Sequence, residues 1–210
     1  RPDAIECAQG FAATQSESFQ PRAVRPDASQ NFAVEENLFK YHAACYLTHA
    51  GIEALKQIKE EYNIDSDQVE KVEQFVPKTH FTVCNIAEPQ TGLEVKFSMR
   101  HAAAMTLADV DTGSLHSYSD DIASRADLVE LRDKVTIIDK SFNSRMQSEV
   151  IVHLKDKRSL HQFSDAGVPA SDLDKQEAKL IRKFNSLVTP IYGEEVSEIV
   201  LEKCLRLDSL

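Results

Sequence analysis

Hydrophobic and polar positions show no regular pattern over the first part of the chain. Residues 1–37 contain three prolines and several Ser and Gln, so we expect an irregular segment with at most one short helix. From Gly51 to Tyr62, apolar side chains recur at helical spacing. Thr48 stands just before this helix, where an N-terminal cap would lie. Regular structure is therefore expected to begin near Thr48.

The middle of the chain mixes strand-like and helical patterns. Alternation over residues 69–76 favours a strand that ends at Pro77, although the spacing also fits a helix. A short extended piece is expected over 81–84. Residues 98–109 are apolar on nearly every side, which indicates a helix buried within the protein. A further helix, in two pieces, is expected over 120–131.

Alternation with a period of two dominates the next part of the chain. It predicts strands near residues 134–139, 148–155 and 158–163, the last two joined by a turn at Asp156–Lys157. Helices followed by strands and then helices predict an α+β fold with an antiparallel sheet and packed helices, rather than a repeated βαβ unit.

Two segments with apolar stripes at helical spacing end the chain, within residues 174–207, and Pro190 is expected to stop the first. We therefore divide the chain into an irregular junction segment at 1–37, an α+β domain at 38–170, and C-terminal helices at 171–210. Exposed apolar stripes promote association, so we expect a dimer or a higher oligomer.

Charge and composition limit the classes of partner. The formal net charge is −10, which argues against nucleic acid as the main partner because phosphate binding needs a basic face. No apolar run approaches the ~20 residues that span a bilayer. The start of the chain lacks the apolar core of a signal peptide. We therefore expect a cytoplasmic protein with no membrane partner.

The cysteines are scattered singly, which suits a reducing cytoplasm. Cys7, Cys45, Cys84 and Cys204 form no CxxC pair. We interpret Cys84 and Cys204 as small buried hydrophobic side chains. No spacing of His, Cys, Asp and Glu suggests a metal site, so none is predicted.

Short motifs follow one another in order along nearly the whole chain. They are Gln9–Phe11 (QGF), Phe39–Ala50 (FKYHAACYLTHA), Glu94–Ser98 (EVKFS), the strand segment Val150–Asp156, and Gly167–Pro169 with Lys183–Phe184. Together they resemble the C-terminal half of the MmgE/PrpD family, which includes 2-methylcitrate dehydratase and cis-aconitate decarboxylase. Ala50 stands where the family usually has proline, and Arg100–His101 where many members have an apolar or Pro-Tyr pair. These departures affect the expected substrate more than the family.

The resemblance implies an α+β lid domain within a longer, two-domain protein. The N-terminal helical domain of such a protein supplies much of the active site, and the C-terminal helices return to it. Members typically act on small di- and tricarboxylic acids without a metal or organic cofactor, usually as homodimers. The resemblance therefore implies a lyase, specifically a dehydratase of a 2-methylcitrate-like substrate, with decarboxylase and epimerase as alternatives. It also implies that the C-terminal part alone is inactive.

These reactions move a proton on a carbon beside a carboxylate, so the site needs an acid/base and cationic groups. His49 suits the first task, because the helix dipole near its position disfavours imidazolium and the free N–H groups there can bind a carboxylate. The resemblance also places a functional histidine at His49 and gives Lys40 a role in binding a substrate carboxylate. Cys45 and Tyr46 either line the same pocket or pack in the core.

Lys96 lies between two apolar residues, so it is expected either in an internal ion pair or facing a cavity as a substrate-binding group. His101 interrupts an apolar helix and is interpreted as a core histidine. His153 and His161 are expected on the surface of the sheet.

Two other hypotheses stay open. In one, the chain is a noncatalytic dimerising or binding module. In the other, it has an unrelated α+β fold and its motifs match the family by coincidence. The presence of a helical domain before Arg1 in the full-length protein would favour the enzyme.

Overall fold

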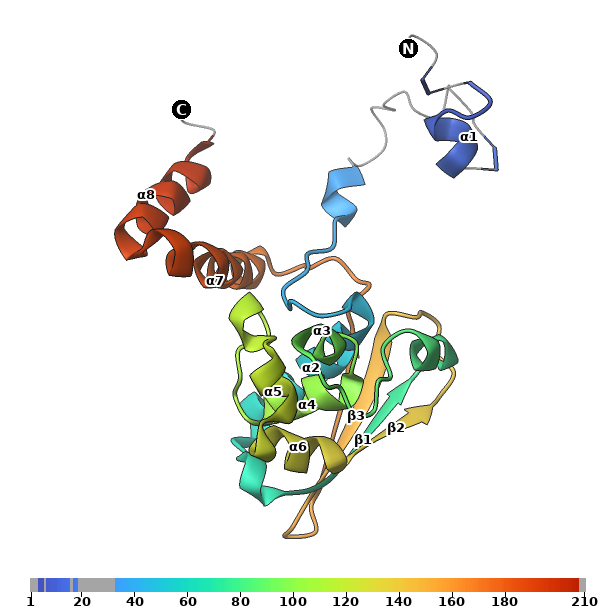
Figure 1. Ribbon diagram of the computed structural model, residues 1–210, viewed down its shortest axis with the longest axis vertical. Coiled ribbons are helices and arrows are strands. Elements are labelled where there is room, and N and C mark those ends of the chain that lie inside the picture. The colour runs from blue at the N-terminus through green and yellow to red at the C-terminus, as the bar shows by residue number, and fades with distance from the viewer. Residues whose placement is uncertain (1–3, 6, 16, 19–32, 208–210) are drawn as a thin grey trace. The chain divides into compact units, whose positions relative to one another are not determined.

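The computed structural model describes residues 4–5, 7–15, 17–18 and 33–207, and the chain divides into two compact units, Arg1–Asn37 and Leu38–Leu210 (Figure 1). In the first unit, helix α1 (Phe11–Gln15) follows a turn in which the Phe11 amide donates to the Ala4 carbonyl at 3.0 Å. A single 3₁₀ turn, η2 (Ala33–Glu36), lies near the end of that unit. The described part of this segment therefore holds little regular structure, as predicted.

A four-stranded sheet with the order β2–β1–β3–β4 forms the centre of the second unit. Its strands are β1 (Val69–Val76), β2 (Val135–Asp139), β3 (Gln147–Leu154) and β4 (Ser159–Asp165). Strand β3 pairs antiparallel with both β1 and β4, while β2 pairs parallel with β1. The predicted α+β fold is confirmed, and the four expected strands form. The sheet is mixed because a helical crossover connects β1 to β2, and such a connection suits a parallel pair.

Helices cover one face of this sheet (Figure 1). Helix α2 (His49–Tyr62) packs against β3 and β4, and α4 (Met99–Leu107) packs between α2 and α6 (Ala126–Asp133). The short helices α3 (Gly92–Val95) and α5 (Asp120–Ser124) contact one another. The helices predicted near 51–62 and 98–109, and the two-piece helix at 120–131, are therefore confirmed.

Helix α2 approaches the sheet closely at Gly51. A Cβ atom at this position would lie 2.1 Å from Nε2 of Gln74, a buried side chain of β1. The missing side chain lets the first turn of α2 lie on the sheet, so that Leu55 and Ile58 are buried in the core. This packing fixes the start of α2, where His49 lies.

Two local predictions are wrong. Thr48 has helical backbone angles, and its Oγ1 donates to the Cys45 carbonyl at 2.8 Å, so it does not cap α2. The 3₁₀ turn η3 (Tyr46–Thr48) instead continues directly into the helix. Residues 81–84 are not extended, because the 3₁₀ helix η5 (Lys78–Thr82) buries His80, whose Nε2 lies 2.7 Å from the Arg145 carbonyl.

The chain ends in helices α7 (Leu173–Tyr192) and α8 (Glu194–Leu205), as predicted. Pro190 does not stop α7, because a proline in the last turn removes only one helical hydrogen bond; the helix ends at Gly193, which has a φ of 80°. No side chain of α7 is buried. Cys204 is exposed, contrary to prediction, because no element of the described chain covers its face of α8.

Among the residues described, no helix combines the length and apolar character that crossing a membrane requires.

Candidate functional site

The segment from Phe39 to His49 is held by backbone hydrogen bonds to the two ends of α4. The Cys45 amide donates to the Lys96 carbonyl before α4, and the Ala43 amide donates to the Thr112 carbonyl after it, both at 2.8 Å. The segment then turns through η3 into α2. Residues that lie far apart in the sequence are thereby gathered around the first turn of α2.

His49 is buried at the start of α2, with 2% of its surface exposed. Its ring lies between those of Tyr46 and His42, with centroid distances of 4.6 and 4.8 Å. Burial lowers the pKa of His49 to about 3, with further lowering from His42 and Lys40, while a hydrogen bond to the Ala44 backbone opposes the shift. The ring is therefore neutral at pH 7, and its Nε2 has no hydrogen-bond partner in the described part of the chain.

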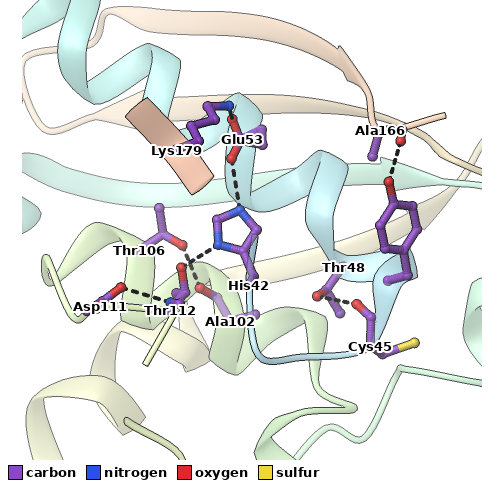
Figure 2. Close-up of polar contacts among 12 residues, drawn as sticks. His42, Cys45, Thr48, Glu53, Ala102, Thr106, Asp111, Thr112, Ala166 and Lys179 are labelled. Atoms are coloured by element: carbon purple, nitrogen blue, oxygen red, sulfur yellow. Dashed lines mark hydrogen bonds and ion pairs between the residues drawn. The ribbon is translucent and has the colours of Figure 1, made fainter. Parts of the chain in front are cut away.

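His42 belongs to a chain of polar contacts that joins three segments (Figure 2). Its Nε2 lies 2.9 Å from Oε1 of Glu53, and its Nδ1 lies 2.8 Å from Oγ1 of Thr112. Lys179 of α7 donates to Oε2 of Glu53 at 2.6 Å.

These contacts define the protonation states of His42 and Glu53. Burial raises the pKa of Glu53, but hydrogen bonds from His42 and Lys179 outweigh it and hold the pKa at about 2. Burial also lowers the pKa of His42, so the ring is neutral. An ionised Glu53 can only accept, so Nε2 of His42 carries the proton and Nδ1 accepts from the hydroxyl of Thr112. The tautomer follows from these contacts, and both ring nitrogens are engaged.

Lys40, Lys96 and Lys183 bring three ammonium groups to the same region. Lys40 is exposed and has no ion pair among the described residues. Nζ of Lys96 lies 5.4 Å from the centroid of the Tyr118 ring. Lys183 of α7 donates to the Gly113 carbonyl at 2.7 Å. Burial lowers the pKa of Lys183. The carboxylate of Asp111 opposes this shift, and the charges of Lys40 and Lys96 add to it.

Cys45 and Tyr46 complete the surroundings of His49, and both are partly buried. The Tyr46 hydroxyl donates to the Ala166 carbonyl at 2.7 Å, which connects η3 to the end of the hairpin. The Cys45 thiol contacts that of Cys84, and burial followed by this contact raises the pKa of Cys84 to about 12. Cys84 is fully buried, as predicted.

A cavity of about 360 Å³ opens between α2, α7 and the loop after α4. Tyr41, His42, Glu53 and Lys183 are among its lining residues. His49 and Lys40 do not line it. The His49 ring therefore contacts a residue that lines the cavity, His42, without lining the cavity itself.

Residues 42–207 match the family model of the MmgE/PrpD C-terminal domain. The chain belongs to the MmgE/PrpD family. None of the curated proteins compared matches it. The family match contains His49, Cys45, Tyr46 and Lys96, and it begins two residues after Lys40.

The MmgE/PrpD domain brings the predicted site residues into one neighbourhood. His49, Tyr46 and Cys45 lie together, and the charge of Lys40 reaches the His49 ring. Lys96 forms a contact with an aromatic ring rather than the internal ion pair that was one of its two predicted settings.

Sequence reasoning missed His42, Glu53, Lys179 and Lys183. Two of them had a signal in the sequence, since His42 lies in the Phe39–Ala50 motif and Lys183 in the Lys-Phe motif near the end of the chain. Glu53 and Lys179 have ordinary positions in their helices, and only the docking of α7 brings Lys179 to Glu53. Within the described ranges, no group of three His, Cys, Asp or Glu side chains is placed to hold a metal ion.

Proposed function

We propose that this chain supplies one side of the active site of a carboxylic-acid lyase, a dehydratase of a 2-methylcitrate-like tricarboxylate. His49 is the acid/base of this side, and Lys40 binds a substrate carboxylate. The observation that carries the proposal is the buried, neutral His49 ring, which has an unpartnered Nε2 among the described residues and lies close enough to Lys40 for that charge to lower its pKa. Membership of the MmgE/PrpD family supports the same chemistry.

A neutral imidazole can accept a proton from a carbon beside a carboxylate. General bases work best with a pKa near the operating pH, and the pKa of His49 in the chain is about 3. A substrate carboxylate close to the ring would raise that pKa, because a negative charge stabilises imidazolium. The acid/base function of His49 would thus develop when substrate binds.

The lysines would stabilise the negative charge that builds up on the substrate carboxylate as the proton leaves. Lys40 is exposed and free to contact a ligand, while Lys183 and Lys96 add positive potential nearby. The Tyr46 ring packs against that of His49, and we propose that the Tyr46 side chain moves to let the substrate reach the buried Nε2. Its single hydrogen bond to Ala166 is the contact that such a movement breaks.

A noncatalytic dimerising module is the second candidate function. The observation that favours it is the row of exposed apolar side chains on α8 and the end of α7, which includes Ile191, Val196 and Ile199. Contiguous apolar surface of this kind marks interaction sites. The two functions are compatible if the module also forms part of an active site.

Turnover by the full-length protein tests the enzymatic proposal, with 2-methylcitrate, citrate and cis-aconitate as substrates. His49→Ala should lower kcat by about 10²–10⁴-fold, the usual effect of losing a general acid/base. Lys40→Gln should mainly raise KM, because it removes binding shared by the ground and transition states. The chain of residues 1–210 by itself should show no turnover.

His161→Gln is the matched control, because His161 is exposed on β4 and pairs with Glu149 away from the site. It should leave kcat and KM unchanged. A His49→Ala protein with wild-type kcat would show that the histidine is structural. If no carboxylic acid is turned over by the full-length protein, the dimerising module becomes the better account.

A further inference from the structure

The cavity between α2 and α7 is positively charged in a chain whose formal net charge is −10. Five basic side chains line it against three acidic ones; the basic residues are Lys56, Lys175, Lys179, Arg182 and Lys183. An adjoining cavity of about 340 Å³ shares Lys56 and Arg182 with it. Clefts lined by one sign of charge concentrate ions of the opposite sign.

Most of these charges already have partners within the described chain. Both oxygens of Glu53 are occupied, one by His42 and the other by Lys179. Lys183 donates to the Gly113 carbonyl, and Lys175 pairs with Asp172 at 3.5 Å.

Lys56 and Arg182 differ from these residues, because neither makes a hydrogen bond or ion pair with any described residue. They face the same two cavities from different helices. Burial lowers the pKa of the Lys56 ammonium group. The carboxylates of Glu53 and Asp111 oppose this shift, and the nearby cations of Arg182 and Lys179 add to it. Two cations that line the same partly enclosed space without a hydrogen-bonded or ion-paired partner leave their donors available to a bound anion.

We propose that this cavity binds a small anion with at least two negative charges, held between Lys56 of α2 and Arg182 of α7. Carboxylate and phosphate groups both have this chemistry, and a planar guanidinium binds either one through two parallel hydrogen bonds. The site differs from the one proposed at His49 and Lys40, because neither of those residues lines the cavity.

Anion binding at this site would fasten α7 to the body of the domain. Helix α7 has no fully buried side chain, and hydrogen bonds link it to α2 and to the loop after α4, from Lys179 to Glu53 and from Lys183 to the Gly113 carbonyl. An anion bridging Lys56 and Arg182 adds a third link between the same elements. We therefore expect ligand-dependent protection of α7.

Two measurements on the purified chain test this proposal. Isothermal titration with citrate and with inorganic phosphate, against sodium chloride of equal ionic strength, should detect binding of citrate, phosphate or both. Hydrogen exchange of the α7 amides should slow in the presence of the anion that binds. Lys56→Gln and Arg182→Gln should each weaken binding about tenfold or more, because each removes a charge-assisted hydrogen bond. Glu60→Gln should strengthen binding, because it removes a carboxylate that lines the cavity.

Lys59→Gln is the matched control. Lys59 lies on the same helix but is already paired with Asp109 at 2.7 Å, so its loss should change anion affinity less than about twofold. Lys40→Gln should also retain binding. If Lys40→Gln abolishes citrate binding while Arg182→Gln preserves it, the anion binds at the His49 site, which overturns this inference and supports the proposed function. Absence of citrate and phosphate binding, or unchanged exchange in α7, would also overturn it.

Discussion

The body of the domain and its terminal helices carry similar apolar stripes but use them differently. Helix α2 places Leu55 and Ile58 in the core against the sheet, where each exposes no more than 1% of its surface to solvent. Helix α8 leaves Val196, Ile199 and Val200 exposed. Helical spacing of apolar residues thus shows which face will be buried, but only the presence of a complementary surface decides whether burial happens.

The two regions also differ in what attaches them. Dispersion and hydrophobic burial hold α2 and α4 to the sheet, whereas α7 is held at Glu53 and Gly113 by lysine side chains. Hydrophobic packing depends little on moderate concentrations of simple salt, while contacts between exposed charged groups are screened by it. The terminal helices should therefore respond to moderate salt that leaves the body largely unchanged.

Truncation of a core side chain should produce the largest difference between the regions. Leu55→Ala removes a fully buried side chain of α2 and should lower the free energy of unfolding by about 2–5 kcal/mol. Ile199→Ala removes an exposed side chain of α8 and should change it by no more than about 0.5 kcal/mol. Urea unfolding of both variants makes the comparison. Equal losses would mean that α8 is buried in solution.

The second-largest difference between the two regions should be the loss of stability of the body in acid. His42, His49, His80 and His101 are all buried, and burial lowers the pKa of each, to about 3 for His49 and about 4 for His101. The unfolded chain binds these protons near pH 6.5, whereas the folded chain does not. Stability is therefore fully present above pH 6.5 and is lost as the pH falls from there towards these folded pKa values.

Each such histidine contributes up to about 1.4 kcal/mol per pH unit to this loss. In His49→Gln the slope of unfolding free energy between pH 6 and pH 5 should fall by about that amount. Leu115→Ala alters an exposed, non-titrating side chain and should leave the slope unchanged. An unaltered slope in His49→Gln would mean that His49 is accessible to protons in the folded protein.

Loss of the Glu53 carboxylate should have a smaller effect that is concentrated at α7. Glu53→Gln leaves Lys179 without its partner and weakens the contact to His42, which should cost about 1–3 kcal/mol. Hydrogen exchange of α7 should accelerate more than that of β1 or β3. Glu88→Gln, at an exposed site, should change neither the free energy of unfolding nor the hydrogen exchange of α7. Uniform acceleration throughout the domain would contradict the separate attachment of α7.

Charge placed on α8 should barely alter stability but should reduce association. Sedimentation of the chain should show a dimer or higher oligomer, and Ile199→Lys should shift it towards monomer, because a charge disrupts an apolar contact. Leu115→Lys is the control, since Leu115 is an exposed apolar residue of the body, outside α7 and α8. A wild-type chain that stays monomeric at high concentration would show that the exposed stripes have no partner of their own kind.

The sequence by itself determined the positions of the main helices and strands. Periods of 3.6 and 2 in the apolar residues located α2, β1 and β3, because those segments bury one face against a neighbour, while the nearly all-apolar run of α4 indicated a helix buried on all sides. The order of motifs also identified the family, and the segment from Phe39 to Ala50 pointed to His49.

Only the tertiary structure decided the capping of α2, the exposure of Cys204 and the contacts between α2 and α7, because the local sequence pattern carries no information about them. Thr48 has the right side chain for a cap and stands directly before α2, but η3 runs into the helix there, and the Thr48 hydroxyl donates to the Cys45 carbonyl instead of accepting from an α2 amide. Cys204 has the spacing of a buried residue on a helix whose partner surface the described chain does not supply. The His42–Glu53–Lys179 contacts and the cavity of Lys56 and Arg182 depend on α7 meeting α2, two helices separated by more than a hundred residues. Periodicity reports only the relation of a residue to its own helix or strand, so contacts between distant elements follow from packing.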